Sequence, residues 1–176
     1  MQAFSSSSLQ LQPAESKIRP VNGATKIEFG YTAPMIYIEN NSISRDHIRQ
    51  LLLEYAIRPT SQRVEIASVL LTQPQHLSAD QVMANVNRLE VIVSKATVYN
   101  TLNLFAGKGL IRQVIIDSGK VFYDSNTANH HHIFNEDTGV LQDVEAGKIT
   151  IENMPALPDG TERAGVDVII RVRNKT

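Results

Sequence analysis

The sequence predicts an α+β protein in which an N-terminal winged-helix unit is followed by a smaller unit built mainly of strands. Three observations support this fold class. Apolar residues recur at helical spacing between residues 48 and 105, two β-rich segments joined by a turn follow directly, and a strand-like pattern resumes beyond Asp124. A length of 176 residues, of which 42% are hydrophobic, is enough for one or two small cores.

This pattern divides the chain into three parts. Residues 1–43 contain a run of four serines and a glutamine-rich patch without a sustained apolar period, so we expect a flexible extension and assign it no function. Residues 44–123 form the predicted winged-helix domain, and residues 124–176 form the second domain.

Two amphipathic helices are predicted first, separated by a break at Arg58-Pro59-Thr60. The buried positions of the first helix are Ile48, Leu51, Leu52 and Tyr55. Those of the second helix are Val64, Ala67, Leu70 and Leu71.

The next two helices have predicted N-caps at Ser78 and Ser94. Ser78 and Gln81 have the spacing of a capping box, in which each side chain bonds the other residue's backbone amide. The third helix should bury Val82, Val86 and Leu89, and the fourth should bury Val98, Leu102 and Phe105. The fourth should end near Gly107 or Gly109 and expose Thr97, Asn100, Thr101 and Asn103.

Strands account for most of the remaining chain. Leu110–Ile116 and Val121–Tyr123 flank Asp117-Ser118-Gly119-Lys120, a composition suited to a hairpin turn, and helices followed by such a hairpin are typical of a winged helix. The second unit should contain strands at His130–Asn135, Val140–Val144 and Val166–Val172, with room for one helix.

Composition narrows the function classes. The formal net charge of −1 hides an asymmetry: residues 44–123 carry nine basic and six acidic residues, whereas residues 124–176 carry five and nine. The winged-helix unit is therefore the better candidate for contact with phosphates. The chain contains no Cys, which excludes disulfides, thiolate catalysis and cysteine zinc sites. No run of apolar residues or N-terminal leader pattern predicts membrane insertion or export, so we expect a cytoplasmic protein.

The fourth helix has the composition of a DNA-recognition helix. In a winged helix this element enters the major groove, where short polar side chains meet base edges and cations hold phosphates. On this basis the predicted DNA-contacting residues are Lys95, Thr97, Tyr99 and Asn100, with Arg58, Arg63 and Arg112 on the DNA backbone. The alternative is that Tyr99 is a packed aromatic and the cations are a solvated face.

The histidines suggest a metal site. Alternate residues of a strand share a face, so His130 and His132 should point one way and His131 the other. If Asp137 and Thr138 form a two-residue hairpin turn, His132 pairs with Asp143, which then shares that face. Imidazole and carboxylate groups are suitable ligands for iron, zinc or manganese that binds reversibly. The alternative is a polar strand that binds no ligand.

Four segments occurring in order carry a family resemblance: 58–63 (RPTSQR), 76–80 (HLSAD), 96–102 (ATVYNTL) and 130–132 (HHH). Together they resemble the ferric uptake regulator family over residues 44–144, and the ending at 166–173 (VDVIIRVR) is similar to its iron response regulator branch. The resemblance implies a winged-helix DNA-binding domain, a C-terminal α/β dimerisation domain, and a homodimer that binds promoter DNA and is not an enzyme.

The resemblance also implies a regulatory metal site that joins one histidine of the DNA-binding domain to ligands of the dimerisation domain. The matching positions are His76, Asp124, His130, His132 and Asp143, with Asp124 in place of the more usual glutamate. Asn135 and Thr138 replace the Cys-x-x-Cys pair that holds structural zinc in many relatives, so that zinc site should be absent. A further family site lacks its usual ligand because no histidine follows His132.

Haem is a second ligand that the resemblance suggests. The iron response regulator branch senses haem, and the triple-histidine run (His130, His131 and His132) is its proposed haem-binding feature. An N-terminal Cys-Pro haem motif of some members is absent here, so haem would have to use an imidazole and compete with metal.

The sequence leaves two other functions open. A metal-dependent hydrolase would need an activated water and a free general acid or base, and the sequence has no H-E-x-x-H, nucleophile elbow or phosphate loop. A metal-independent winged-helix DNA-binding or protein-interaction module would keep the fold without the regulatory ligand.

Overall fold

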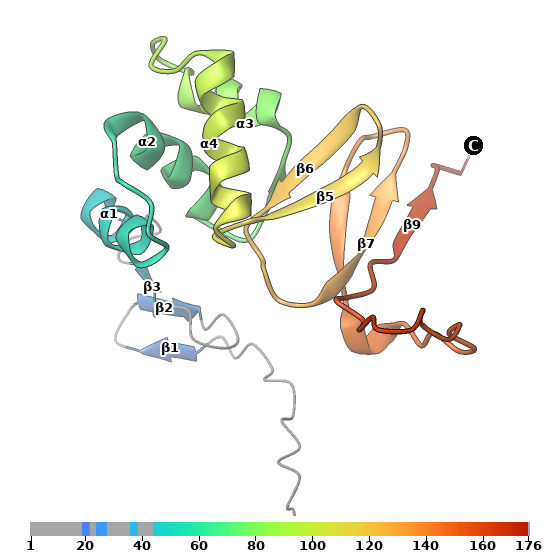
Figure 1. Cartoon of the computed structure of the whole chain (residues 1–176). Coiled ribbons are helices and arrows are strands. Elements are labelled where there is room, and N and C mark those ends of the chain that lie inside the picture. The colour runs from blue at the N-terminus through green and yellow to red at the C-terminus, as the bar shows by residue number, and fades with distance from the viewer. Residues whose placement is uncertain (1–18, 22–23, 28–35, 39–43, 176) are drawn as a thin grey trace, which may run out of the picture.

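The computed structural model describes residues 19–21, 24–27, 36–38 and 44–175. A helical unit and a C-terminal sheet lie side by side, with a β-hairpin between them (Figure 1). The helices are α1 (Arg45–Glu54), α2 (Ser61–Leu71), α3 (Ala79–Val86) and α4 (Lys95–Gly107). The strands from residue 76 onward are β4 (His76–Leu77), β5 (Arg112–Asp117), β6 (Lys120–Asp124), β7 (His130–Asn135), β8 (Leu141–Glu145) and β9 (Ile169–Val172).

Side-chain caps define where the helices begin. Ser44, Thr60, Ser78 and Ser94 each accept a hydrogen bond from the backbone N–H three residues later. Ser78 and Gln81 form the predicted capping box. Gly109 follows the end of α4 with a φ of 73°, a left-handed conformation that glycine adopts without steric cost. These contacts confirm the predicted starts of α3 and α4 and the end of α4.

The four helices enclose the main hydrophobic core, whose fully buried side chains include Ile48, Leu52, Val64, Leu70, Val82, Val98, Leu102 and Phe105. Two predictions about this region were wrong. Leu89 is 90% exposed because α3 ends at Val86, so Leu89 is not on the apolar face of the helix. Thr101 is buried, because it lies beside Leu102 and Val98 on the core side of α4 rather than on its outer face.

The hairpin β5–β6 belongs to two cores. Its base contributes Ile111 and Tyr123 to the helical core, while Val114, Ile116 and Phe122 pack with Phe134 and Leu141 of the C-terminal sheet. The rings of Phe122 and Phe134 have centroids 6.1 Å apart. The hairpin therefore connects the two units rather than projecting freely into solvent.

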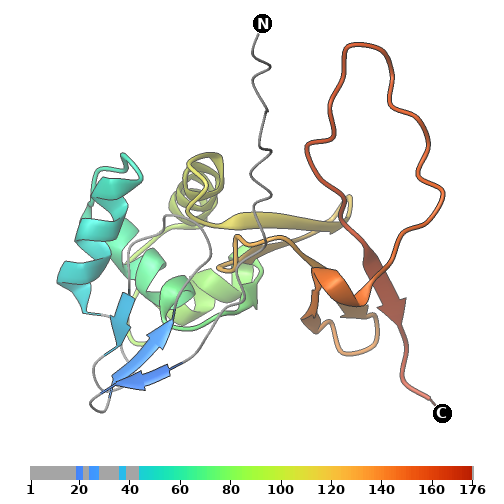
Figure 2. The same cartoon turned by 90° about the horizontal axis from the view of Figure 1, so that it is seen from below.

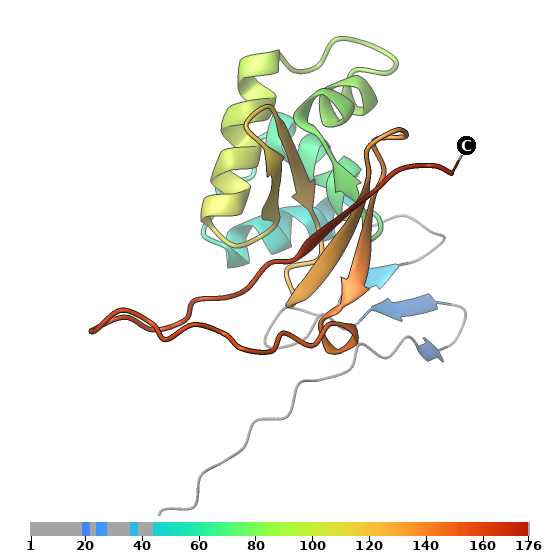
Figure 3. The ribbon, with the colours of Figure 1, turned by 90° about the vertical axis from the view of Figure 1, so that its right-hand side faces the viewer.

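The C-terminal sheet has the strand order β8-β7-β9. β7 and β8 are antiparallel with His132 opposite Asp143, which confirms the predicted pairing. The two-residue turn expected at Asp137 and Thr138 is wrong: residues 136–139 form the turn, and the Gly139 N–H donates to the Asn135 carbonyl. β9 runs parallel to β7 and begins at Ile169, so the last strand is shorter than the predicted Val166–Val172. The only helical element between β8 and β9 in the described chain is a 3-10 turn at Ala146–Lys148. Residues 149–168 form a long loop that extends away from the sheets and returns to β7, where the Val168 carbonyl accepts from the His132 N–H (Figures 2 and 3).

The extension predicted at residues 1–43 lies mostly outside the described residues. Its described parts form a three-stranded antiparallel sheet of β1 (Arg19–Val21), β2 (Ala24–Ile27) and β3 (Ile36–Ile38), which the sequence did not predict. None of the described helices combines the length and apolar character needed to cross a bilayer.

Candidate functional site

The two-residue strand β4 supplies the first candidate ligand of the metal site, His76. β4 lies between α2 and α3 and pairs with the end of β6, so that His76 is directly opposite Asp124. β4 was not predicted from the sequence, because a two-residue strand is too short to show an alternating pattern. Pairing of backbone groups therefore brings the first two candidate ligands together from positions 48 residues apart.

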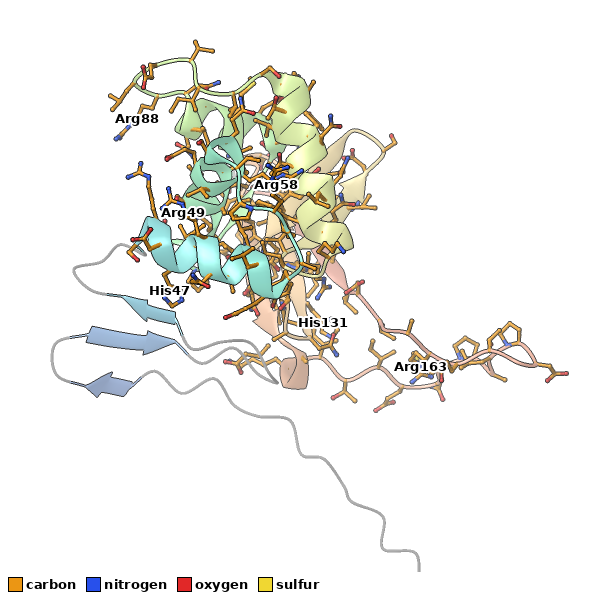
Figure 4. The ribbon with its side chains drawn as sticks, turned by 60° about the vertical axis from the view of Figure 1, so that its left-hand side comes forward. His47, Arg49, Arg58, Arg88, His131 and Arg163 are labelled. Atoms are coloured by element: carbon orange, nitrogen blue, oxygen red, sulfur yellow. The ribbon has the colours of Figure 1, made fainter. Side chains whose placement is uncertain are left out.

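The C-terminal sheet supplies the other three ligands. His130 and His132 share one face of β7, and Asp143 of β8 lies opposite His132 on that face. His131 points the other way, where its Nδ1 accepts a hydrogen bond of 3.4 Å from the Val168 backbone N–H. Figure 4 labels His131 on the C-terminal sheet. The alternation predicted for the three histidines is thus confirmed.

The structure brings all five predicted metal-site residues together. Each of His76, Asp124, His130, His132 and Asp143 offers one ligand atom, and these atoms lie within 4.8 Å of one another. His76 Nε2 is 2.8 Å from Asp143 Oδ1, and His130 Nε2 is 2.9 Å from Asp124 Oδ2. The Nε2 atoms of His130 and His132 are 3.0 Å apart. Three imidazole nitrogens and two carboxylate oxygens therefore converge on one point.

The chemistry of these groups fits a divalent cation. Within the described chain, the buried atoms His76 Nε2 and Asp124 Oδ2 form no hydrogen bond, although they lie only 3.4 Å apart. His130 Nδ1 donates a hydrogen bond of 2.8 Å to the Ala128 carbonyl, which leaves its Nε2 lone pair free to bind a metal. An N₃O₂ donor set without thiolate suits iron, manganese or zinc.

The ionisation of the site reflects its crowded charges. Burial lowers the pKa of His76, but the carboxylates of Asp124 and Asp143 outweigh burial and raise that pKa to about 9. Burial also opposes ionisation of Asp124, yet the three neighbouring histidines hold its pKa well below the usual range. The pKa of His130 is raised and that of Asp143 is lowered by contacts of the same kind.

These shifts predict a pH dependence of metal binding. Without metal, His76 keeps its proton up to about pH 9, so a metal ion that binds its Nε2 must displace that proton. Affinity for Mn²⁺ should therefore rise as the pH rises from 6 to 8.5, by about tenfold per pH unit for each displaced proton. Calorimetry in buffers of different ionisation enthalpy measures the protons released. A His76→Ala variant that releases as many protons as the wild type would contradict this assignment.

The DNA-recognition helix predicted from sequence is α4. Lys95, Tyr99 and Asn100 are exposed on it, and the helix carries no acidic side chain. Lys95 Nζ lies 5.6 Å from the Tyr99 ring centroid and 3.1 Å from Asp80 Oδ1, a solvated ion pair that salt readily screens. Thr97 is half-buried, and its hydroxyl lies 2.9 Å from that of the N-cap Ser94. Thr97 is thus tied to the helix start.

Two of the predicted arginines, Arg58 and Arg63, lie at or just before the start of α2, and the third, Arg112, lies at the start of β5. Arg58 is exposed between α1 and α2 (Figure 4), and Arg63 Nη1 donates to the Arg58 carbonyl at 3.0 Å. The start of α2 contacts the loop before α4 through the Gln62 side chain and the Ile92 carbonyl. Arg112 lies beyond the other end of α4, roughly 20 Å along the helix axis. There it forms an ion pair with Asp167, so the structure does not group it with the other residues.

The supporting role of the loop at residues 125–129 was not predicted from the sequence. Asn126 contacts both carboxylates of the site, and the Ala128 carbonyl holds His130. The signal available was a cluster of Asp, Ser and Asn, residues that bond nearby backbone amides in turns. That composition predicts a turn but not which ligands the turn supports.

Comparison with known proteins relates this geometry to a family of regulators. The sequence model of the protein family described as "Ferric uptake regulator family" matches residues 54–161 of the chain. The chain is 31% identical over 94 residues to the peroxide-responsive repressor PerR of Staphylococcus aureus strain Mu50. This match covers 53% of the present chain and 64% of that repressor, just under two thirds of its length.

Solved structures of ferric uptake regulators share the fold. A Francisella tularensis regulator with iron is 25% identical with a TM-score of 0.56, covering 68% of this chain and 92% of that one. A Pseudomonas aeruginosa regulator with manganese is 24% identical with a TM-score of 0.55, covering 73% and 98%. The shared fold confirms the predicted α+β class. The family match and the PerR repressors agree with the prediction that the chain is not an enzyme. By its match to the family model over most of its length, the chain belongs to the ferric uptake regulator family.

Proposed function

We propose that this chain is a homodimeric, sequence-specific regulator whose affinity for promoter DNA is set by a divalent metal ion at the five-residue site. Residues 44–123 serve as the DNA-binding domain in this proposal, and residues 124–176 serve in dimerisation and sensing. A regulator of this kind acts on chromosomal DNA in the cytoplasm.

One observation carries the proposal. His76 and Asp124 belong to the sheet β4-β6-β5, which packs with the helical unit, whereas His130, His132 and Asp143 belong to the C-terminal sheet. A metal ion held by all five residues therefore links the two units. Because it binds best where both sets of ligands are in place, it favours one relative orientation of the units, and with it one spacing of two α4 helices in a dimer.

The native ion is proposed from donor chemistry and from relatives. Nitrogen and carboxylate donors accept Fe²⁺, Mn²⁺ and Zn²⁺ alike. The relatives named above were solved with iron and manganese, or are described as peroxide-responsive. We infer a role in iron homeostasis, with the bound ion acting as a reversible crosslink between the histidines and carboxylates.

The resemblance to the iron response regulator branch adds a finer proposal, that the protein binds DNA under iron limitation and releases it when haem binds at residues 130–132. All three imidazoles are buried, so haem binding in this proposal requires a local opening of the structure around β7. We expect haem to shift its Soret band on binding to the wild type and to bind less tightly to His131→Ala. Equal Soret spectra for haem with and without protein would count against haem sensing.

Duplex-DNA binding tests the main proposal. The purified protein is selected against a promoter library, and the affinity of the best fragment is measured across a salt series with and without Mn²⁺. A regulator should show a steep fall in affinity with salt and a metal-dependent shift. Binding that is salt-sensitive but indifferent to Mn²⁺, Fe²⁺ and Zn²⁺ would indicate a metal-independent winged-helix module, and an absence of DNA binding would contradict the proposal.

A further inference from the structure

Asn126 lies between the two carboxylates of the metal site and bonds to both. Its backbone N–H donates to Asp124 Oδ1 at 2.7 Å, and its side-chain Nδ2 donates to Asp143 Oδ2 at 3.0 Å. Asp124 and Asp143 come from different sheets, β6 and β8. One residue of the loop at 125–129 therefore bridges the acidic ligands of both units.

The oxygens that Asn126 holds are not those that face the histidines. Asp124 Oδ2 is the atom 2.9 Å from His130 Nε2, and Asp143 Oδ1 is the atom 2.8 Å from His76 Nε2. Each carboxylate thus has one oxygen bound by an N–H of Asn126 and one oxygen directed at the imidazoles. This arrangement presents a single oxygen from each acid to a metal ion.

The orientation of the Asn126 amide is itself fixed. Its Oδ1 accepts a hydrogen bond of 3.2 Å from the Ala128 N–H, which leaves Nδ2 as the group facing Asp143. The Ala128 carbonyl accepts from His130 Nδ1. The turn at residues 126–128 therefore orients three of the five ligands, Asp124, Asp143 and His130.

We propose that Asn126 is a positioning residue of the metal site, whose side-chain amide keeps Asp143 bound to the metal through one oxygen and so sets affinity and coordination number. The inference rests on the proposed function, because it requires that the five residues bind a metal ion. A residue that hydrogen-bonds a metal ligand holds that ligand in its binding orientation, and loss of such a residue commonly lowers metal affinity by about ten- to hundredfold. Without the amide, Asp143 is free to turn and bind through both oxygens.

Asn126→Ser tests this role with little disturbance of the loop. The serine hydroxyl retains an oxygen for the Ala128 N–H, as serine commonly does in such turns, but is too short to reach Asp143. The backbone bond to Asp124 is unchanged. We expect affinity for Zn²⁺ to fall by about tenfold or more. The affinity of Asn126→Ala for Zn²⁺ should fall by at least as much. Asn129→Ala is the matched control, because Asn129 is exposed in the same loop.

A double-mutant cycle separates positioning from general damage to the loop. If Asn126 acts through Asp143, Asn126→Ser should change Zn²⁺ affinity by less than about twofold in an Asp143→Ala background. A loss of the same size in both backgrounds would mean that the effect passes through the loop and not through Asp143, which would overturn the inference.

Bound Co²⁺ gives a readout that a structural role alone would not change. Its visible absorption depends on coordination number, so Asn126→Ser should alter the band intensity even when the site is saturated, while Asn129→Ala should retain the wild-type spectrum. Wild-type affinity and spectrum in Asn126→Ser would overturn the inference but leave the metal site intact. Failure of the wild type to bind Zn²⁺ or Co²⁺ would instead refute the proposed function.

Discussion

Replacing His130 and His132 together by alanine is expected to lower the affinity for Mn²⁺ and Zn²⁺ by more than about a hundredfold. This loss exceeds the one typical of a residue that only hydrogen-bonds a metal ligand. Two of the three Nε2 ligands are removed, and Asp124 keeps only His76 as an imidazole partner. Isothermal titration calorimetry measures the loss directly. Circular dichroism of the metal-free variant checks that the secondary structure is retained.

His131→Ala is the control for this prediction. It removes a buried imidazole from the same strand, but from the face opposite the candidate site, so metal affinity should stay within a few-fold of the wild type. If the double variant proves too unstable because the buried Asp124 carboxylate loses its partners, Asp143→Asn, at the half-exposed edge of the site, tests the same claim. Undiminished affinity in both variants would mean that the metal binds elsewhere.

The second large effect is expected on α4. Asn100→Ala should weaken binding to a selected promoter fragment by about 1–3 kcal/mol, and should weaken binding to unrelated duplex far less, because a short amide on the exposed face is suited to contact with base edges. Lys95→Ala should instead weaken binding to all duplexes and reduce the slope of log affinity against log salt by about one. Fluorescence anisotropy across a salt series distinguishes the two behaviours.

Lys108→Ala serves as the matched charge control for the α4 prediction. Lys108 is an exposed cation at the C-terminal cap of the same helix, roughly 20 Å from Lys95. Arg112→Ala tests the arginine that the structure separates from the others, and it should also have little effect on DNA. If the Lys108 and Lys95 variants lost affinity equally, binding would depend on overall charge rather than on the start of α4.

The elements with strong local signals were predictable from sequence. Ser78 and Gln81 are three residues apart, and the side chain of each bonds the backbone N–H of the other, so a short stretch of sequence contains the whole interaction. The pairing of His132 with Asp143 was also predicted, because the four-residue turn at 136–139 keeps the same register as the two-residue turn expected from the sequence.

What sequence could not predict depends on contacts between distant segments. β4 exists because two residues pair with β6, and neither residue shows an alternating pattern by itself. Leu89 continued the apolar spacing of α3 but lies beyond the C-cap residue Asn87, whose side chain bonds the following loop at Ile92 and Val93. The role of Asn126 requires both carboxylates to be in place, and these come from separate sheets.

The most direct test of the account is the effect of Mn²⁺ on promoter DNA affinity, measured in parallel for the wild type and for the variant that carries both His130→Ala and His132→Ala. We predict that metal changes the wild-type affinity by about 5- to 150-fold, the usual range of coupling between two sites, and leaves the variant unchanged. An equal response in both proteins, or no response in the wild type, would contradict the claim that the five-residue site controls DNA binding.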